Sequence, residues 1–127
     1  MSSATDTASL IANAVNRLLE EVPALKPLKL VVGLDLRGRG DTQQYRIELP
    51  GPVVTKDIAA DSRVRIEVPR AFFNEMAKDG QVADWREAFM YGQAKATGPT
   101  QILQLIERVV DKQEERQRAR RAKPRGS

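Results

Sequence analysis

The chain has 127 residues and a net charge of +4, and it contains neither histidine nor cysteine. The commonest general base, the commonest zinc ligands and any thiol nucleophile are therefore missing. The sequence also has no Gly-x-Ser-x-Gly, Walker or Gly-x-Gly-x-x-Gly motif, so we expect no enzyme, no cofactor and no metal site.

Length and hydropathy favour a single soluble domain. A chain of this size can bury about two thirds of its unfolded surface. No apolar run approaches the roughly 18 residues that span a bilayer. Residues 1–9 lack the basic and apolar regions of a secretory signal. These features predict a soluble, cytoplasmic protein.

The first predicted element is a helix that covers the core. Apolar residues between Leu10 and Leu19 recur at spacings of three and four, which places them on one side of a helix. Asp6 or Thr7 can cap its start, and prolines soon after its last apolar residue end it. We expect residues 1–9 to form a disordered N-terminus.

Four strands are predicted next, because apolar and polar residues alternate. They cover residues 28–37, 44–49, 53–56 and 63–68. The glycine-rich residues 38–41 are interpreted as a hairpin connection instead of a phosphate loop, since no helix follows them. Strands in direct succession predict an antiparallel meander. Its outward face would carry charges of both signs that can pair across strands, namely Asp35, Arg37, Arg46, Glu48, Arg63, Arg65 and Glu67.

Two short helices are predicted after the fourth strand, over residues 69–80 and 82–92, and each ends at a glycine. Five of the six aromatic residues lie in residues 72–91, which builds one apolar region. Such a cluster can be ordinary core packing. It can also line a site for an irregular apolar ligand, to which the flexible Met76 and Met90 are suited.

A brief fifth strand over residues 93–97 and a long last helix complete the domain. Gly98 or Thr100 can cap this helix, and Pro99 suits its first turn. Its apolar face runs to Val110, so we expect it to dock on the domain for about three turns.

The order of glycines and apolar residues over residues 61–106 is the most specific pattern in the chain. It comprises a helix ending in Gly, an Ala-Phe-x-x-Gly turn, a Lys-x-x-Gly strand exit and a closing apolar helix. This order resembles the lipid-binding core of the sterol carrier protein type-2 family. The residues that carry the resemblance are Asp61, Val64, Ile66, Val68, Phe73, Met76, Gly80, Trp85, Ala88, Phe89, Gly92, Lys95, Gly98, Ile102, Leu103, Leu105 and Ile106.

The resemblance implies an α+β fold with a five-stranded, mostly antiparallel sheet that is covered on one face by helices. It also implies an apolar tunnel between the sheet and the helices, for non-catalytic binding and possible transfer of a fatty acyl or sterol-like lipid. The implied lining residues are Leu34, Ile47, Phe73, Met76, Trp85, Phe89, Met90, Ile102, Leu105 and Ile106.

Some features depart from the family pattern. Pro99-Thr100 stands where the family often has a small acidic or amide residue, and the last three residues are no peroxisomal address. These two departures favour a bacterial-type cytoplasmic protein over a peroxisomal one. The basic end of the chain is a further addition to the family pattern.

The positive charge is concentrated at the end of the chain. Residues 112–127 carry a net charge of +5 and residues 1–111 a net charge of −1. We therefore divide the chain into residues 1–9, a domain over residues 10–111 and a basic tail over residues 112–127. The candidate contacts of the tail with a membrane or another anionic partner are Arg116, Arg118, Arg120, Arg121, Lys123 and Arg125.

Three interpretations of the tail stay open. It can be a solvated helix end that fades into disorder. It can attract anionic lipid headgroups, at about 1 kcal/mol per basic residue near a charged surface. It can also bind nucleic-acid phosphates, although it has no aromatic residue to stack on bases.

Three function classes follow. Lipid binding is the first. The alternative is a protein or nucleic-acid interaction module that acts through the basic tail, with a filled core. An enzyme is the most distant class, because Asp35, Tyr45 and Asp57 show no spacing that assembles a site. A second copy or a membrane could close an exposed tunnel mouth.

Overall fold

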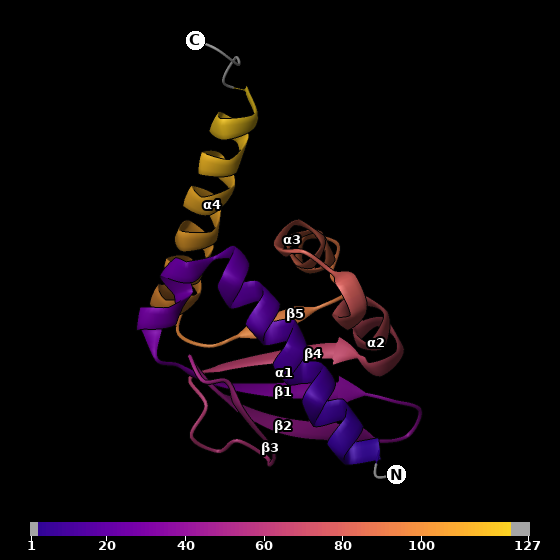
Figure 1. Ribbon diagram of the computed structural model, residues 1–127. Coiled ribbons are helices and arrows are strands. Elements are labelled where there is room, and N and C mark those ends of the chain that lie inside the picture. Colours follow the sequence, from indigo (N-terminus) through magenta and orange to yellow (C-terminus); the bar gives the residue numbers. More distant parts are fainter. Residues whose placement is uncertain (1–2, 123–127) are drawn as a thin grey trace.

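A computed structural model describes residues 3–122, with side chains over residues 7–120, as an α+β fold (Figure 1). Of the predicted tail contacts, the side chains of Arg121, Lys123 and Arg125 lie outside the described part. The elements in chain order are α1 (Ser3–Glu21), the 3-10 helix η1 (Pro23–Leu28), β1 (Val31–Arg37), β2 (Thr42–Glu48), β3 (Val53–Lys56), β4 (Val64–Pro69), α2 (Arg70–Asp79), α3 (Val82–Met90), β5 (Lys95–Thr97) and α4 (Thr100–Ala122).

The five strands form one mixed sheet in the order β3-β2-β1-β4-β5, which confirms the predicted fold class. The pairs β1–β2, β2–β3 and β4–β5 are antiparallel. The meander is wrong for β4, which crosses to the other side of β1 and runs parallel to it, with Ile66 opposite Leu34. Alternation within a strand specifies which face is buried, but it does not specify the neighbouring strand or its direction.

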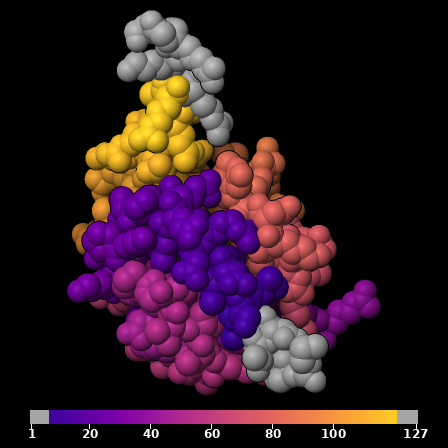
Figure 2. All heavy atoms as spheres, in the orientation of Figure 1, coloured from indigo at the N-terminus to yellow at the C-terminus, as the bar shows by residue number. Residues whose placement is uncertain are grey.

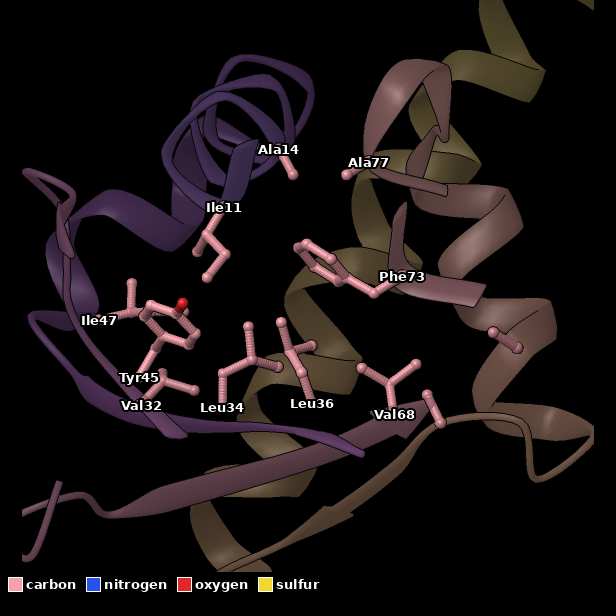
Figure 3. Packing of buried hydrophobic residues seen from close by; sticks show 12 residues of the cluster. Ile11, Ala14, Val32, Leu34, Leu36, Tyr45, Ile47, Val68, Phe73 and Ala77 are labelled. Carbon is pink, nitrogen blue, oxygen red and sulfur yellow. The ribbon is translucent and has the colours of Figure 1, made fainter. Parts of the chain in front are cut away.

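The hydrophobic core lies between one face of the sheet and the helices (Figure 3). Inward side chains of β1, β2 and β4 meet α1 and α2 there. Leu36 and Tyr45 are fully buried, each with 0% of its surface exposed. The core residues labelled in Figure 3 are Ile11, Ala14, Val32, Leu34, Leu36, Tyr45, Ile47, Val68, Phe73 and Ala77.

Helix α1 begins at Ser3, whereas the sequence predicts disorder over residues 1–9. Residues 3–9 contain neither Gly nor Pro, so nothing in their backbone prevents them from continuing the helix. Their last members, with Leu10, lie in the first turns that contact the core, since Ala8 packs against it. The helix therefore extends further towards the N-terminus than the apolar stripe from which it is predicted.

Helix α1 also holds the joint between α2 and α3. Arg17 donates hydrogen bonds to the carbonyl oxygens of Ala77 at 3.1 Å and Lys78 at 2.9 Å, at the C-terminal end of α2. Glu21 accepts a hydrogen bond from the backbone N–H of Val82 at 3.0 Å, at the start of α3. Both contacts satisfy backbone groups that a helix end leaves unpaired.

The outward sheet face is a network of ion pairs, as the alternating charges predict. Arg65 pairs with Asp35 at 2.8 Å, across the parallel strands β1 and β4. Arg37 pairs with Glu67 at 2.6 Å across the same two strands. Arg46 pairs with Asp61 at 2.8 Å and so attaches the loop between β3 and β4. This face is therefore held together by charge pairs and is a solvated surface.

Helix α4 is 23 residues long and stands out from the rest of the molecule (Figures 1 and 2). The predicted tail residues 112–122 continue it without a break, and the boundary at residue 112 stays a prediction. None of the apolar side chains of α4 is fully buried, and none belongs to the core cluster. The docking that the apolar face predicts is thus incomplete.

Candidate lipid-binding site

Three of the ten predicted lining residues lie deep in the core. Leu34, Ile47 and Phe73 have 4%, 5% and 4% of their surface exposed. Trp85 is half-buried and packs on Phe73, with ring centroids 5.9 Å apart and the rings tilted by 46°. We call these four residues the closed group. Their apolar surfaces are already covered by other side chains of the core.

The other six lining residues lie nearer to solvent, on α2, α3 and α4. Phe89, Leu105 and Met90 are exposed, with 37%, 41% and 74% of their surface accessible. Met76, Ile102 and Ile106 are half-buried. We call these six residues the open group, because their apolar surfaces are only partly covered. Tyr91 follows Met90 directly, is 71% exposed and was not among the predicted lining residues.

One cluster of ion pairs connects α3 to α4. Arg86 pairs with Asp111 at 2.5 Å and also with Glu114. The hydrogen bond with Glu114 is the main cause that raises the pKa of Arg86 above its ordinary value. The sequence gives one signal for this link that we missed. Asp111 and Glu114 are three residues apart, and so share one side of a helix that is otherwise mostly basic.

Two hollows of the described surface lie elsewhere. The first is at the start of α2 and the second lies between α1 and the turn before β3. The first is lined by Arg37, Gly38, Arg39, Pro69, Arg70, Ala71 and Asn74, and the second by Asn16, Leu19, Glu20, Lys26, Pro50 and Gly51. Neither contains one of the ten predicted lining residues, so the tunnel stays a prediction.

The residues weighed for catalysis do not converge. Asp35 faces outward and is paired with Arg65. Tyr45 is buried on the opposite face, where it lies across from Leu34 in the pairing of β1 with β2. Asp57 accepts a hydrogen bond from the backbone N–H of Ala59 at 3.2 Å in the loop after β3. Three separate environments therefore hold these three groups.

The described residues contain no group of three or more Asp, Glu, His or Cys side chains placed to hold a metal ion. None of their helices is both long enough and apolar enough to cross a membrane.

Comparison with solved structures identifies the fold. The apo form of sterol carrier protein 2 from Yarrowia lipolytica matches with a TM-score of 0.55 and 16% identity, over 85% of this chain and 89% of that one. The palmitated SCP2L2 of Aedes aegypti matches with a TM-score of 0.53 and 16% identity, over 77% and 91% of the two chains. The chain has the sterol carrier protein 2 fold.

A third solved structure agrees with these two. Sterol carrier protein 2 of Aedes aegypti in complex with palmitate matches with a TM-score of 0.50 and 11% identity, over 77% of this chain and 91% of that one. No protein-family model and no curated protein matches the sequence. The sterol carrier protein 2 fold is thus established from structure, while the bacterial-type qualifier and the cytoplasmic location stay predictions.

Proposed function

We propose that this chain binds an apolar lipid, fatty acyl or sterol-like, between its core and the helices α3 and α4. The observation that carries this proposal is the exposure of Phe89, Met90 and Leu105 on these two helices. Apolar surface of this kind gains stability when a ligand covers it, at about 25 cal/mol per Å². The fold supports the proposal, since two of the similar structures contain palmitate.

The attachment of α4 suits a movable cover over such a ligand. Within the described residues, Arg86 forms the only ion pairs between α3 and α4, and its side chain is 38% exposed. Ion pairs at this exposure contribute little to stability, about 1 kcal/mol or less. The apolar face of α4 can therefore lift from the domain and close again over a ligand. Binding by this route forms and breaks no covalent bond. The lipid can therefore leave again, which allows its transfer.

The test combines native mass spectrometry of gently purified protein with lipid extraction and a fluorescence titration. Trp85 is the only tryptophan of the chain and packs in the proposed site, so it can donate energy to a bound fluorescent fatty acid or sterol. We expect copurified lipid and saturable energy transfer. An empty protein that binds neither probe would refute the proposal.

Matched variants locate the binding site. Phe89→Arg and Met90→Arg place a charge in the open group at side chains that are already exposed, so the variants should fold. Ile58→Arg makes the same change at an apolar side chain that is 65% exposed, in the loop after β3. We expect the first two to weaken binding about tenfold or more, and the third to leave it unchanged.

A second candidate function is contact with an anionic surface through α4. Arg108, Lys112, Arg116 and Arg120 recur every four residues and are all exposed. This spacing places them along one side of the helix. None of the four forms an ion pair with another described residue. We call them the basic stripe and propose that it contacts anionic lipid headgroups.

Sedimentation with vesicles tests this contact. The full chain should bind vesicles that contain phosphatidylglycerol and release them as salt rises. Replacing Arg108, Lys112 and Arg116 with Gln should abolish binding. The control variant replaces the exposed Arg39, Lys56 and Lys95 with Gln, which removes the same charge elsewhere on the protein. It should still bind the vesicles. Preferential binding of RNA over these vesicles would contradict the membrane proposal and favour the nucleic-acid alternative.

A further inference from the structure

The hollow at the start of α2 concentrates positive charge. It has a volume of about 460 Å³ and lies between the hairpin that joins β1 to β2 and the first residues of α2. Three of the residues that line it are arginines, namely Arg37, Arg39 and Arg70, and none is acidic. The lipid-binding proposal uses none of these side chains, so their arrangement needs another explanation.

The fold brings a helix start to the glycine-rich residues 38–41, although no helix follows them along the chain. Arg70, the first residue of α2, pairs with Asp41 of the hairpin at 2.8 Å. A Cβ atom at Gly38 would lie 2.7 Å from the guanidinium carbon of Arg70, so a larger residue there would displace this side chain. Figure 2 shows the hairpin projecting from the molecule next to α2. The guanidinium of Arg70 is thus held in place by the hairpin.

The start of α2 also offers backbone donors. Pro69 is the N-cap of α2 and gives no side-chain hydrogen bond, and the first turn of the helix contains no acidic residue. Pro69 and Ala71 both line the hollow, which therefore lies at the positive end of the helix dipole. A helix start of this kind beside guanidinium groups is favourable for an anion.

The arginines keep donors after their ion pairs. Arg37 pairs with Glu67 through Nε at 2.6 Å, and Arg70 pairs with Asp41 through Nη2. A guanidinium has five N–H donors, so each pair leaves others for a ligand. The Nε of Arg70 is buried and has no hydrogen-bond partner among the described residues. Within the same residues, Arg39 forms no ion pair, so one positive charge at the hollow is not neutralised.

We propose that this hollow binds the phosphate group of a small, soluble phosphate ester. A phosphate carries up to two negative charges and accepts several hydrogen bonds, which matches guanidinium groups beside a helix start. Asn74 lies one turn after Arg70 on the same side of α2 and adds an amide donor. The volume falls within the range of small-molecule sites, about 300–1,000 Å³. It therefore leaves room for the organic part of the ester beside Pro69 and Ala71.

The place of the hollow favours a soluble ester over a lipid headgroup. Figure 1 shows the β1–β2 hairpin and the start of α2 at one end of the sheet, whereas α4 begins at the other end. The later part of α4, with Arg116 and Arg120 of the basic stripe, extends away from the hairpin. A headgroup held there cannot also fill the hollow. The phosphate site is therefore independent of both lipid binding and membrane contact.

NMR titration of the full chain tests the site. The probes are inorganic phosphate, glycerol 3-phosphate and, as the uncharged comparison, glycerol, in a phosphate-free buffer of low ionic strength. We expect both phosphates to shift the backbone amide signals of Gly38, Arg39 and Ala71 saturably, and added salt to weaken the binding. Glycerol should shift none of them. The absence of a saturable shift with phosphates would overturn the inference, and binding of inorganic phosphate alone would overturn the ester.

Variants separate binding from folding. Arg39→Gln removes an exposed guanidinium and should weaken phosphate binding about fivefold or more, whereas Lys56→Gln removes the same charge from β3 and should not. Ala71→Asp places an acid in the first turn of α2 at an exposed residue, where the helix dipole favours it. It should weaken binding about tenfold or more while the melting temperature stays equal or rises. Unchanged binding in either Arg39→Gln or Ala71→Asp would contradict the site.

Vesicles distinguish the two sources of phosphate. Phosphatidic acid presents glycerol 3-phosphate as its headgroup, so vesicles that contain it offer the same group on a membrane. Arg39→Gln and Ala71→Asp should bind these vesicles as the wild type does, because the hollow takes a soluble ester. Loss of vesicle binding in both variants would assign the hollow to a headgroup and overturn the soluble ester. A failure of lipid binding in the fluorescence titration leaves the phosphate site untouched.

Discussion

The joint between α2 and α3 should depend on Arg17, and the structure gives the size of the effect. Arg17→Met keeps most of the aliphatic stem and removes the hydrogen bonds to the carbonyl oxygens of Ala77 and Lys78, at 3.1 and 2.9 Å. Each bond involves a charged donor, but one of them is exposed, so we assign about 1 kcal/mol to each. The variant should lose about 2 kcal/mol of unfolding free energy.

Urea unfolding followed by the fluorescence of Trp85 measures this loss. With a slope of about 2 kcal/mol per M of urea for a domain of this size, the midpoint should fall by about 1 M. Arg39→Met is the matched control, because Arg39 is exposed and forms no ion pair within the described residues. It should move the midpoint by less than about 0.3 M. Equal shifts in the two variants would refute the capping role of Arg17.

Three further predictions concern other contacts. Arg86→Met should speed hydrogen exchange in α4 while leaving exchange in the sheet unchanged, because it removes the ion pairs that join α4 to α3. Gly98→Ala should lower the melting temperature by several degrees, since the added Cβ would lie 2.6 Å from the carbonyl oxygen of Arg63 at a φ of +155°. In Asp61→Asn, the unfolding free energy should fall less steeply than in the wild type as the pH decreases from 7 to 3, as measured by urea unfolding. The hydrogen bond from Arg46 lowers the pKa of Asp61, so this contact stabilises the fold above the ordinary pKa of 3.8 and is lost as pH falls through the lower folded value.

The strands and the outward face could be predicted because each signal is local. Leu34 and Leu36 alternate with Asp35 and Arg37, and this period of two fixes which side chains enter the core. The alternation within β4 likewise places Arg65 on the outward face, where Asp35 of β1 also lies. Sequence periodicity is sufficient for these features, because they depend only on neighbouring residues along one strand.

The partners of β4 and the position of α4 could not be predicted in the same way. Ile66 is apolar in any register, and only the assembled sheet places it opposite Leu34 on the parallel strand β1. The apolar stripe of α4 predicts a docked helix, yet Leu105 stays 41% exposed. A stripe shows which side of a helix avoids water, but it does not show what covers that side.

The division of the predicted lining residues into closed and open groups has a physical basis. Three members of the closed group, Leu34, Ile47 and Phe73, lie in the filled core, where Arg17 and Glu21 attach α1 to the end of α2 and the start of α3. The open group lies mainly on α3 and α4, which the solvent-accessible Arg86 connects. A ligand that enters would meet the open group first, because Phe89, Met90 and Leu105 are already exposed.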